Sequence, residues 1–262
     1  MPRSIIYSKG LRYFAILKLI KSDFLKNAGT LFSGSVIAQL IGFAALTALG
    51  RLYSPEDFGN IETFLKLSGV FAIVAGLRYE TAVVVENDKD KAEDLVRLSL
   101  FLNIAISSLL FLVIVIFKNP IAIFFRFGNA NLLYLLPLMV CLMSFTDTLI
   151  TWHNRSKKYK HISTNRILYS LSGTGYKLLH PLTNLVRGNG LFIGQFIAQS
   201  IAFVHVAYKL PFKVLKFSKD SILSLARSYK SFPLFSSPAA LINLLALSMP
   251  VFMITAFDGP ES

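Results

Sequence analysis

The chain has 262 residues, of which 54% are hydrophobic and 16% are charged, and its mean hydropathy is +0.58. A soluble domain of this length would need a more polar surface, so the composition indicates an integral membrane protein. The net charge of +13 would suggest a nucleic-acid partner for a soluble chain, but here short basic clusters alternate with apolar runs, which argues against nucleic acid.

Residues 1–26 are basic, and a charged residue interrupts them every few positions. They contain no uninterrupted apolar stretch followed by a small-residue cleavage site, so they do not resemble a signal peptide. We predict an amphipathic segment that lies at the membrane interface.

A membrane-spanning helix needs about 20 mostly apolar residues. Two of the candidate spans are interrupted by charge, the second by Lys66, Arg78 and Glu80 and the fifth by Arg166 and Lys177. The fourth continues past its last apolar run to Trp152. The sequence predicts an all-α, polytopic membrane protein with seven transmembrane helices: 27–50, 61–85, 98–117, 127–146, 162–182, 188–208 and 231–257.

The distribution of Lys and Arg tests this count. If all seven segments cross the bilayer, nineteen Lys and Arg lie in the loops on one side and four in the loops on the other. Adding or removing a span would destroy this bias, because every later loop would change sides. By the positive-inside rule the N-terminus is predicted to be cytoplasmic and the end of the seventh span to lie outside.

The last apolar segment repeats features of the first. Leu31-Phe32-Ser33 matches Leu234-Phe235-Ser236, and Gln39 matches Asn243 at nearly the same offset. Both segments follow a basic stretch and cross in the same direction, which is typical of a parallel repeat. The expected organisation is an interfacial segment at 1–26, a six-helix lobe at 27–208, a basic cytoplasmic linker at 209–230, and the first helix of a second lobe at 231–262.

Three stretches carry a resemblance to a known family: "LFSGSVIAQLIGF…RLYSPEDFG", "LRYETAVVV" and the closing "PLFSSPAALIN…FDGPE". They resemble oligosaccharide flippases of bacterial polysaccharide biosynthesis, the O-antigen-type members of the multidrug/oligosaccharidyl-lipid/polysaccharide exporter superfamily. Members usually have about twelve to fourteen spans in two lobes around a central cavity, so this chain looks truncated. The resemblance implies a bacterial inner-membrane transporter of polyprenyl-pyrophosphate-linked oligosaccharide.

Such an anionic substrate calls for basic side chains at membrane depth, where each charge costs about 2.5–3.5 kcal/mol and needs a reason. Arg78 is the first candidate, because its planar guanidinium matches phosphate oxygens; the alternatives are snorkelling and an ion pair with Glu80 or Asp147. Lys66 and Lys177 either line the outer part of the path or reach the headgroups.

Asp147 is a candidate either for binding a coupling ion or as a counter-ion of Arg78, and Glu80 belongs to the same group. Gln39 and Asn243, at matching positions of the repeat, are candidates for sugar contacts, with interhelical hydrogen bonding as the alternative. Gly29, Gly34, Gly173 and Gly175 are expected to allow close helix approach. No spacing of His, Cys or acidic residues indicates a metal, a cofactor or an enzyme.

The leading hypothesis is therefore a flippase that works by alternating access in surface polysaccharide (O-antigen or capsule) synthesis. Its expected partners are lipid-linked oligosaccharide, membrane lipids and either a second-lobe polypeptide or the polysaccharide polymerase machinery. One alternative is an ion-coupled drug exporter of the same superfamily. The other is a truncated, non-transporting membrane fragment or scaffold.

Overall fold

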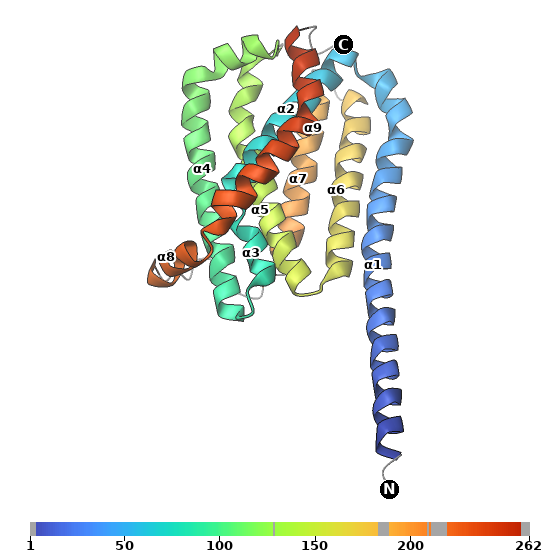
Figure 1. The fold of residues 1–262 in the computed structure, drawn as a ribbon. Coiled ribbons are helices and arrows are strands. Elements are labelled where there is room, and N and C mark those ends of the chain that lie inside the picture. Colours follow the sequence, from blue (N-terminus) through green and yellow to red (C-terminus); the bar gives the residue numbers. More distant parts are fainter. Residues whose placement is uncertain (1–3, 128, 183–188, 209, 211–218, 258–262) are drawn as a thin grey trace.

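The computed structural model describes residues 4–127, 129–182, 189–208, 210 and 219–257, and side chains from Lys26 onward in these ranges except 219–221. All regular structure in them is helical, and the long helices lie side by side in one bundle (Figure 1). The helices are α1 Ser4–Leu52, α2 Pro55–Ala75, α3 Tyr79–Val85, α4 Lys89–Phe124, η1 Ala130–Leu135, α5 Leu136–Arg155, α6 Tyr159–Leu179, η2 His180–Leu182, α7 Asn189–Tyr208, α8 Lys219–Ser228, the π-helical turn η3 Phe232–Ser236 and α9 Ser237–Phe257.

Six of these helices are long and apolar enough to cross a membrane, by themselves or with the turn that precedes them, and this confirms the polytopic all-α prediction. They correspond to the predicted spans around α1, α2, α4, α5, α7 and α9. The remaining predicted span, 162–182, coincides with α6. This helix has 21 residues and packs between α1 and α7, but it is less apolar than the others, so its crossing of the membrane stays a prediction.

The predicted second span is wrong as a single helix. The helical backbone stops after Ala75, and α3 begins only at Tyr79. Between them Leu77 and Arg78 have positive φ angles of 48° and 60°, a left-handed conformation that costs a side-chain-bearing residue about 1–2 kcal/mol. Gly76 caps α2, and a Cβ atom there would lie 2.8 Å from a carboxylate oxygen of Glu80, so the glycine leaves room for this carboxylate beside the break.

The N-terminal segment joins the first span without a break. α1 is one helix of 49 residues, so the boundary predicted between residues 26 and 27 has no counterpart in the backbone. The interfacial position predicted for this segment stays a prediction. The predicted linker 209–230 contains α8, and its residues 211–218 lie outside the described part.

The loops alternate between the two ends of the bundle as the sequence predicted. The start of α1, the loop between α3 and α4, the turn between α5 and α6, and α8 lie toward one end, which we call the basic end (Figure 1). The corner between α1 and α2 and the C-terminal part of α9 lie at the other end. α1 and α9 run in the same direction, as expected for a parallel repeat.

The core consists of two hydrophobic clusters. One joins α2, α4, α5 and α7, with Phe64 fully buried; the other joins α3, α4, α5 and α8 at the basic end and includes Trp152. By contrast, large apolar side chains on α1, α4 and α9 are highly exposed, among them Phe43 at 75% and Ile116 at 71%. A surface of this kind fits contact with lipid, since exposing so many large apolar side chains to water would be unfavourable.

Candidate functional site

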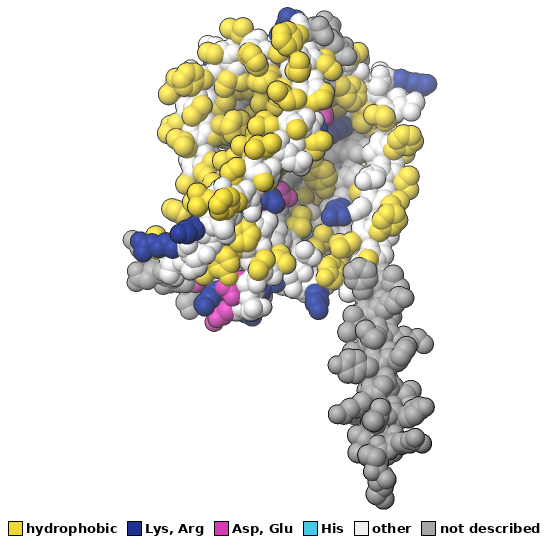
Figure 2. Space-filling view, in the orientation of Figure 1, with side chains coloured by type: hydrophobic (Ala, Val, Ile, Leu, Met, Phe, Trp, Pro, Cys, Tyr) yellow, Lys and Arg dark blue, Asp and Glu magenta, His cyan; other side chains and the backbone are white. Residues whose placement is uncertain are grey.

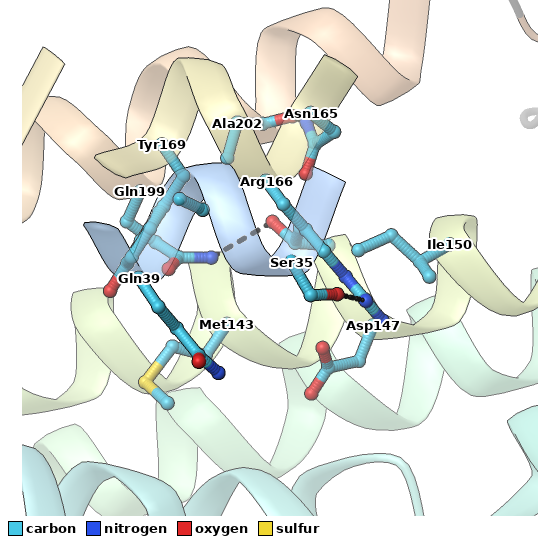
Figure 3. A pocket seen from close by; sticks show the side chains of 12 residues that line it. Ser35, Gln39, Met143, Asp147, Ile150, Asn165, Arg166, Tyr169, Gln199 and Ala202 are labelled. Atoms are coloured by element: carbon cyan, nitrogen blue, oxygen red, sulfur yellow. Dashed lines mark hydrogen bonds between the residues drawn. The ribbon is translucent and has the colours of Figure 1, made fainter. Parts of the chain in front are cut away.

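A polar cavity of about 400 Å³ lies between α1, α5, α6 and α7. Half of its lining residues are uncharged and polar, and one basic and one acidic side chain reach into it from different helices (Figure 3). The lining residues are Ser35, Ala38, Gln39, Met143, Thr146, Asp147, Ile150, Asn165, Arg166, Tyr169, Gln199 and Ala202.

Close contact between α1 and α6 forms one wall of this cavity. A Cβ atom on Gly34 would lie 1.9 Å from Ser163 Oγ, so only glycine lets the two helices approach this closely. Ser170 Oγ donates a hydrogen bond of 2.6 Å to the carbonyl of Ala38. The expectation for Gly34 is confirmed, as it is for Gly173, where a Cβ would lie 2.8 Å from that of Ala198. A Cβ on Gly29 or Gly175 would meet no atom of another helix within 4 Å in the described part of the chain, so neither glycine brings described helices together there.

The charged groups of the cavity are Arg166 and Asp147. The Arg166 guanidinium donates a hydrogen bond to Ser35 Oγ, which holds it at the wall made by α1 (Figure 3). Asp147 extends from α5 and is exposed to the cavity. Among the described residues these two side chains form no ion pair with each other or with other groups. Both charges are therefore available to a ligand.

Amide side chains complete the polar lining. Gln199 Nε2 donates to Thr146 Oγ1 at 3.0 Å and to the carbonyl of Leu142 at 3.2 Å. Asn165 Nδ2 donates to the carbonyl of Ala202 at 2.7 Å. These bonds fix the side chains between α5, α6 and α7. Gln39, from α1, lies at the cavity as a group that can contact a polar ligand, in line with its predicted role (Figure 3).

Lys177 is connected to the cavity through a chain of hydrogen bonds. Its Nζ donates to Gln195 Oε1 at 3.1 Å, and Gln195 Nε2 donates to the hydroxyl of Tyr169, which lines the cavity. Among the described carboxylates, none lies within ion-pair distance of this ammonium group. The amide is thus its polar partner between α6 and α7.

Arg78 and Glu80 lie at the break between α2 and α3 and do not line the cavity. Arg78 Nη1 is 3.4 Å from Glu80 Oε1, which realises one of the alternatives for Arg78. Glu80 is buried, and its Oε2 has no hydrogen-bond partner among the described residues. Neither residue is among those that line the cavity, and Asp147, which does line it, is near enough to feel the charges of both.

The two remaining candidates lie elsewhere. Lys66 pairs with Glu62 one turn earlier on α2, at 3.1 Å, and both side chains are partly exposed. Asn243 is exposed on α9, outside the residues that line the cavity. The equivalence of Gln39 and Asn243 in the repeat therefore does not bring them to one site in this chain.

Sequence reasoning missed Arg166, Tyr169, Asn165 and Gln199 as lining residues. Arg166 was recognised as a charge that interrupts the fifth predicted span, but it was not selected as a candidate site residue; it lies in the second turn of α6. The available signal was the interruption of an apolar segment by charge, which was applied to Arg78 and Lys66 but not to Arg166.

The fold and the cavity define the chain as a polytopic helical membrane protein with charged side chains in a polar cavity between its helices. Figure 2 shows basic and acidic side chains within the hollow between α9 and α1, which hydrophobic side chains border. The sequence profile of the polysaccharide biosynthesis protein family matches residues 24–262, and the chain belongs to this family. No curated protein and no solved structure matches it significantly.

Proposed function

We propose that this protein moves a polyprenyl-pyrophosphate-linked oligosaccharide from the inner to the outer leaflet of a bacterial inner membrane, with its basic end in the cytoplasm. The observation that carries the proposal is the cavity of a polysaccharide biosynthesis family member, in which Arg166 is held without a carboxylate partner. A guanidinium suits pyrophosphate oxygens, and the surrounding amides and hydroxyls suit sugar hydroxyls.

In this mechanism the lipid tail stays in the bilayer while the polar head enters the cavity from the cytoplasmic leaflet. Alternating access requires a second lobe opposite the cavity, and we propose that α9 corresponds to the first helix of such a lobe. Rocking of the lobes would then expose the head on the other side. Arg78, Glu80 and the partly buried Lys177 would tune the potential along the path.

A second candidate, ion-coupled export of a cationic drug, is favoured by one observation: Asp147 is exposed to the cavity. A carboxylate there can bind a proton, Na⁺ or a cationic ligand. Arg166 in the same cavity would repel a cationic drug, so we assign Asp147 to ion coupling and the anionic lipid to the cargo.

Binding of two opposite ligands tests the proposal. The purified chain is reconstituted in proteoliposomes and titrated with a polyprenyl-pyrophosphate-linked oligosaccharide and with a cationic dye. We expect saturable binding of the lipid-linked sugar alone, and restored surface polysaccharide when the chain and a second-lobe fragment are expressed in a flippase-deficient strain. Binding of the dye without the sugar would favour the drug exporter, and binding of neither would favour the scaffold.

A further inference from the structure

A second cavity, of about 650 Å³, lies at the basic end between the α1 helix and the turn that joins α5 to α6. Lys26 lines it from α1, and Lys157, Lys158 and Lys160 line it from the turn and the first residues of α6. None of its described lining residues is acidic. Four lysines thus line one space without a carboxylate among the described lining residues, and their combined positive charge, although screened by water, attracts an anion.

Two histidines form part of the same lining. The rings of His161 and His205 lie 4.1 Å apart, centroid to centroid, and His161 is 9% exposed. Imidazole N–H groups donate hydrogen bonds to phosphate oxygens, and a bound anion favours the charged form of the ring. Thr164 adds a hydroxyl group from α6, whereas the Thr30 hydroxyl donates a 2.8 Å hydrogen bond to the carbonyl of Lys26. The lining is therefore rich in donors of the kind that a phosphate group accepts.

The position of this cavity along the helices indicates where the anion comes from. In the sequence, Lys26 is the last charged residue before the uncharged, largely apolar run 27–50 of α1, and Arg155 closes the apolar stretch of α5, so the cavity lies where these two apolar stretches end. Spans end at the level of the lipid headgroups, and basic pockets between helices at that level suit anionic headgroups.

We propose that this cavity binds the phosphate group of an anionic membrane lipid from the leaflet at the basic end. The lipid would hold α1 against the α5–α6 turn beneath the polar cavity, since it contacts both. This site is separate from the polar cavity, whose residues Ser35 and Arg166 lie farther along α1 and α6. The inference therefore holds whatever the polar cavity transports.

Phosphatidylglycerol binding to the full chain in detergent tests the proposal, with phosphatidylcholine as the uncharged comparison. We expect the combined variant Lys157→Gln, Lys158→Gln and Lys160→Gln to bind phosphatidylglycerol at least about tenfold more weakly, because each lysine near a membrane surface contributes on the order of 1 kcal/mol. The matched control removes three lysines outside the cavity lining, Lys89→Gln, Lys91→Gln and Lys230→Gln, and should change the affinity less than about twofold.

Three outcomes would overturn the proposal. Equal weakening in the control variant would show a general charge effect, and equal binding of phosphatidylcholine would show that charge does not select the lipid. Displacement of phosphatidylglycerol by equimolar inorganic phosphate or pyrophosphate would assign the site to a soluble anion. Each single Lys→Gln variant is measured too, so that misfolding of the triple variant, detected by circular dichroism, still leaves a graded loss to observe.

Discussion

At the scale of single residues, the charged side chains fall into two groups. Lys66 pairs with Glu62 and Arg78 pairs with Glu80. These ion pairs explain the two charges structurally, without a ligand. Arg166 and Lys177 have neutral partners only, among the described residues. A charge whose partners are neutral retains most of its attraction for a ligand, so these two side chains are the better candidates for contacting an anion.

Replacing Arg166 by Ala should weaken binding of the lipid-linked oligosaccharide roughly tenfold to a hundredfold, because hydrogen bonds to charged groups contribute about 1.5–3 kcal/mol. Arg166→Lys should recover only part of the loss, since the ammonium group lacks the bidentate geometry. Arg126→Ala, outside the cavity lining, is the matched control. Unchanged affinity in Arg166→Ala would remove Arg166 from the site.

Arg78→Ala should lower the free energy of unfolding by about 1–3 kcal/mol, because it leaves the buried Glu80 carboxylate without its ion pair. Adding Glu80→Gln should restore most of this loss, since a neutral amide costs less to bury. Denaturant unfolding of the detergent-solubilised protein, followed by circular dichroism, measures both. A double variant as unstable as Arg78→Ala would mean that the pair does not stabilise the break.

At the scale of elements, small residues and polar contacts determine how the helices meet. Gly34 lets α1 approach α6, and the polar cavity lies directly beside this contact. At the basic end, Arg155 donates to the backbone carbonyls of Val83, Glu86, Asn87 and Asp88. One side chain of α5 thus holds the loop after α3, which keeps the broken second segment in place.

Gly34→Ala should destabilise the bundle by about 1–3 kcal/mol, because the new methyl group would overlap Ser163 and force α1 away from α6. Gly29→Ala is a control in the same helix, since its Cβ would meet no atom within 4 Å. Thermal unfolding in detergent compares the two variants. If the unfolding temperature of both variants shifts equally, the effect comes from replacing any glycine of α1 and not from the contact between α1 and α6.

The attachment of α8 should depend on pH. The Tyr229 hydroxyl donates a 2.7 Å hydrogen bond to Glu86 Oε2. The backbone N–H of Asp88 and this hydroxyl lower the pKa of Glu86, while the same bond raises the pKa of Tyr229. The lowered carboxyl pKa stabilises the contact above the ordinary glutamate value of about 4.5, and this contribution disappears as the pH falls through the lowered pKa.

Fluorescence of Trp152 can follow this change, because the chain has one Trp and it packs in the same cluster as Ile222 and Leu225 of α8. On acidification, the emission change in Tyr229→Phe should begin at a higher pH than in the wild type, since the carboxyl pKa rises toward its ordinary value. Glu86→Gln should show no such step. Coincident curves for wild type and Tyr229→Phe would contradict the coupling.

At the scale of the whole molecule, the loops alternate between the two ends of the bundle, which agrees with a protein that crosses the bilayer at each long segment. The least apolar of these long segments is α6, which carries Arg166 and Lys177. Its neighbours α1 and α7 can shield these charges from lipid, since charged groups in membranes face the interior of a bundle.

Reporter fusions after residues 157 and 188 test the crossing of α6. We expect the first reporter to be cytoplasmic and the second to lie outside, because α6 separates the two positions. Fusions after residues 87 and 129, on the two sides of α4, calibrate the assay. If the reporters at 157 and 188 fall on the same side, α6 does not cross, and the proposed cavity at membrane depth loses one wall.

The candidate residues differ in where the structure places them. Asp147 and Gln39 were selected because polar groups in apolar segments need a reason, and both line the cavity. Arg166 was not selected, because a charge near the start of an apolar run can equally mark the end of a helix at the membrane surface. Asn243 was selected because it matches Gln39 in the repeat. Its position in space, however, depends on how α9 packs, and α9 lies against α2.

The sequence by itself determined that the chain is a helical membrane protein, where most of its long apolar helices lie and how its basic residues distribute between the loops. These properties depend on hydropathy and charge summed over neighbouring residues, so they can be read along the chain. Only the tertiary structure decided that α2 breaks before Arg78, that Gly34 brings α1 to α6, and that Ser35, Asp147 and Arg166 share one cavity. These features arise from contacts between residues far apart in sequence, and local composition carries no information about such contacts.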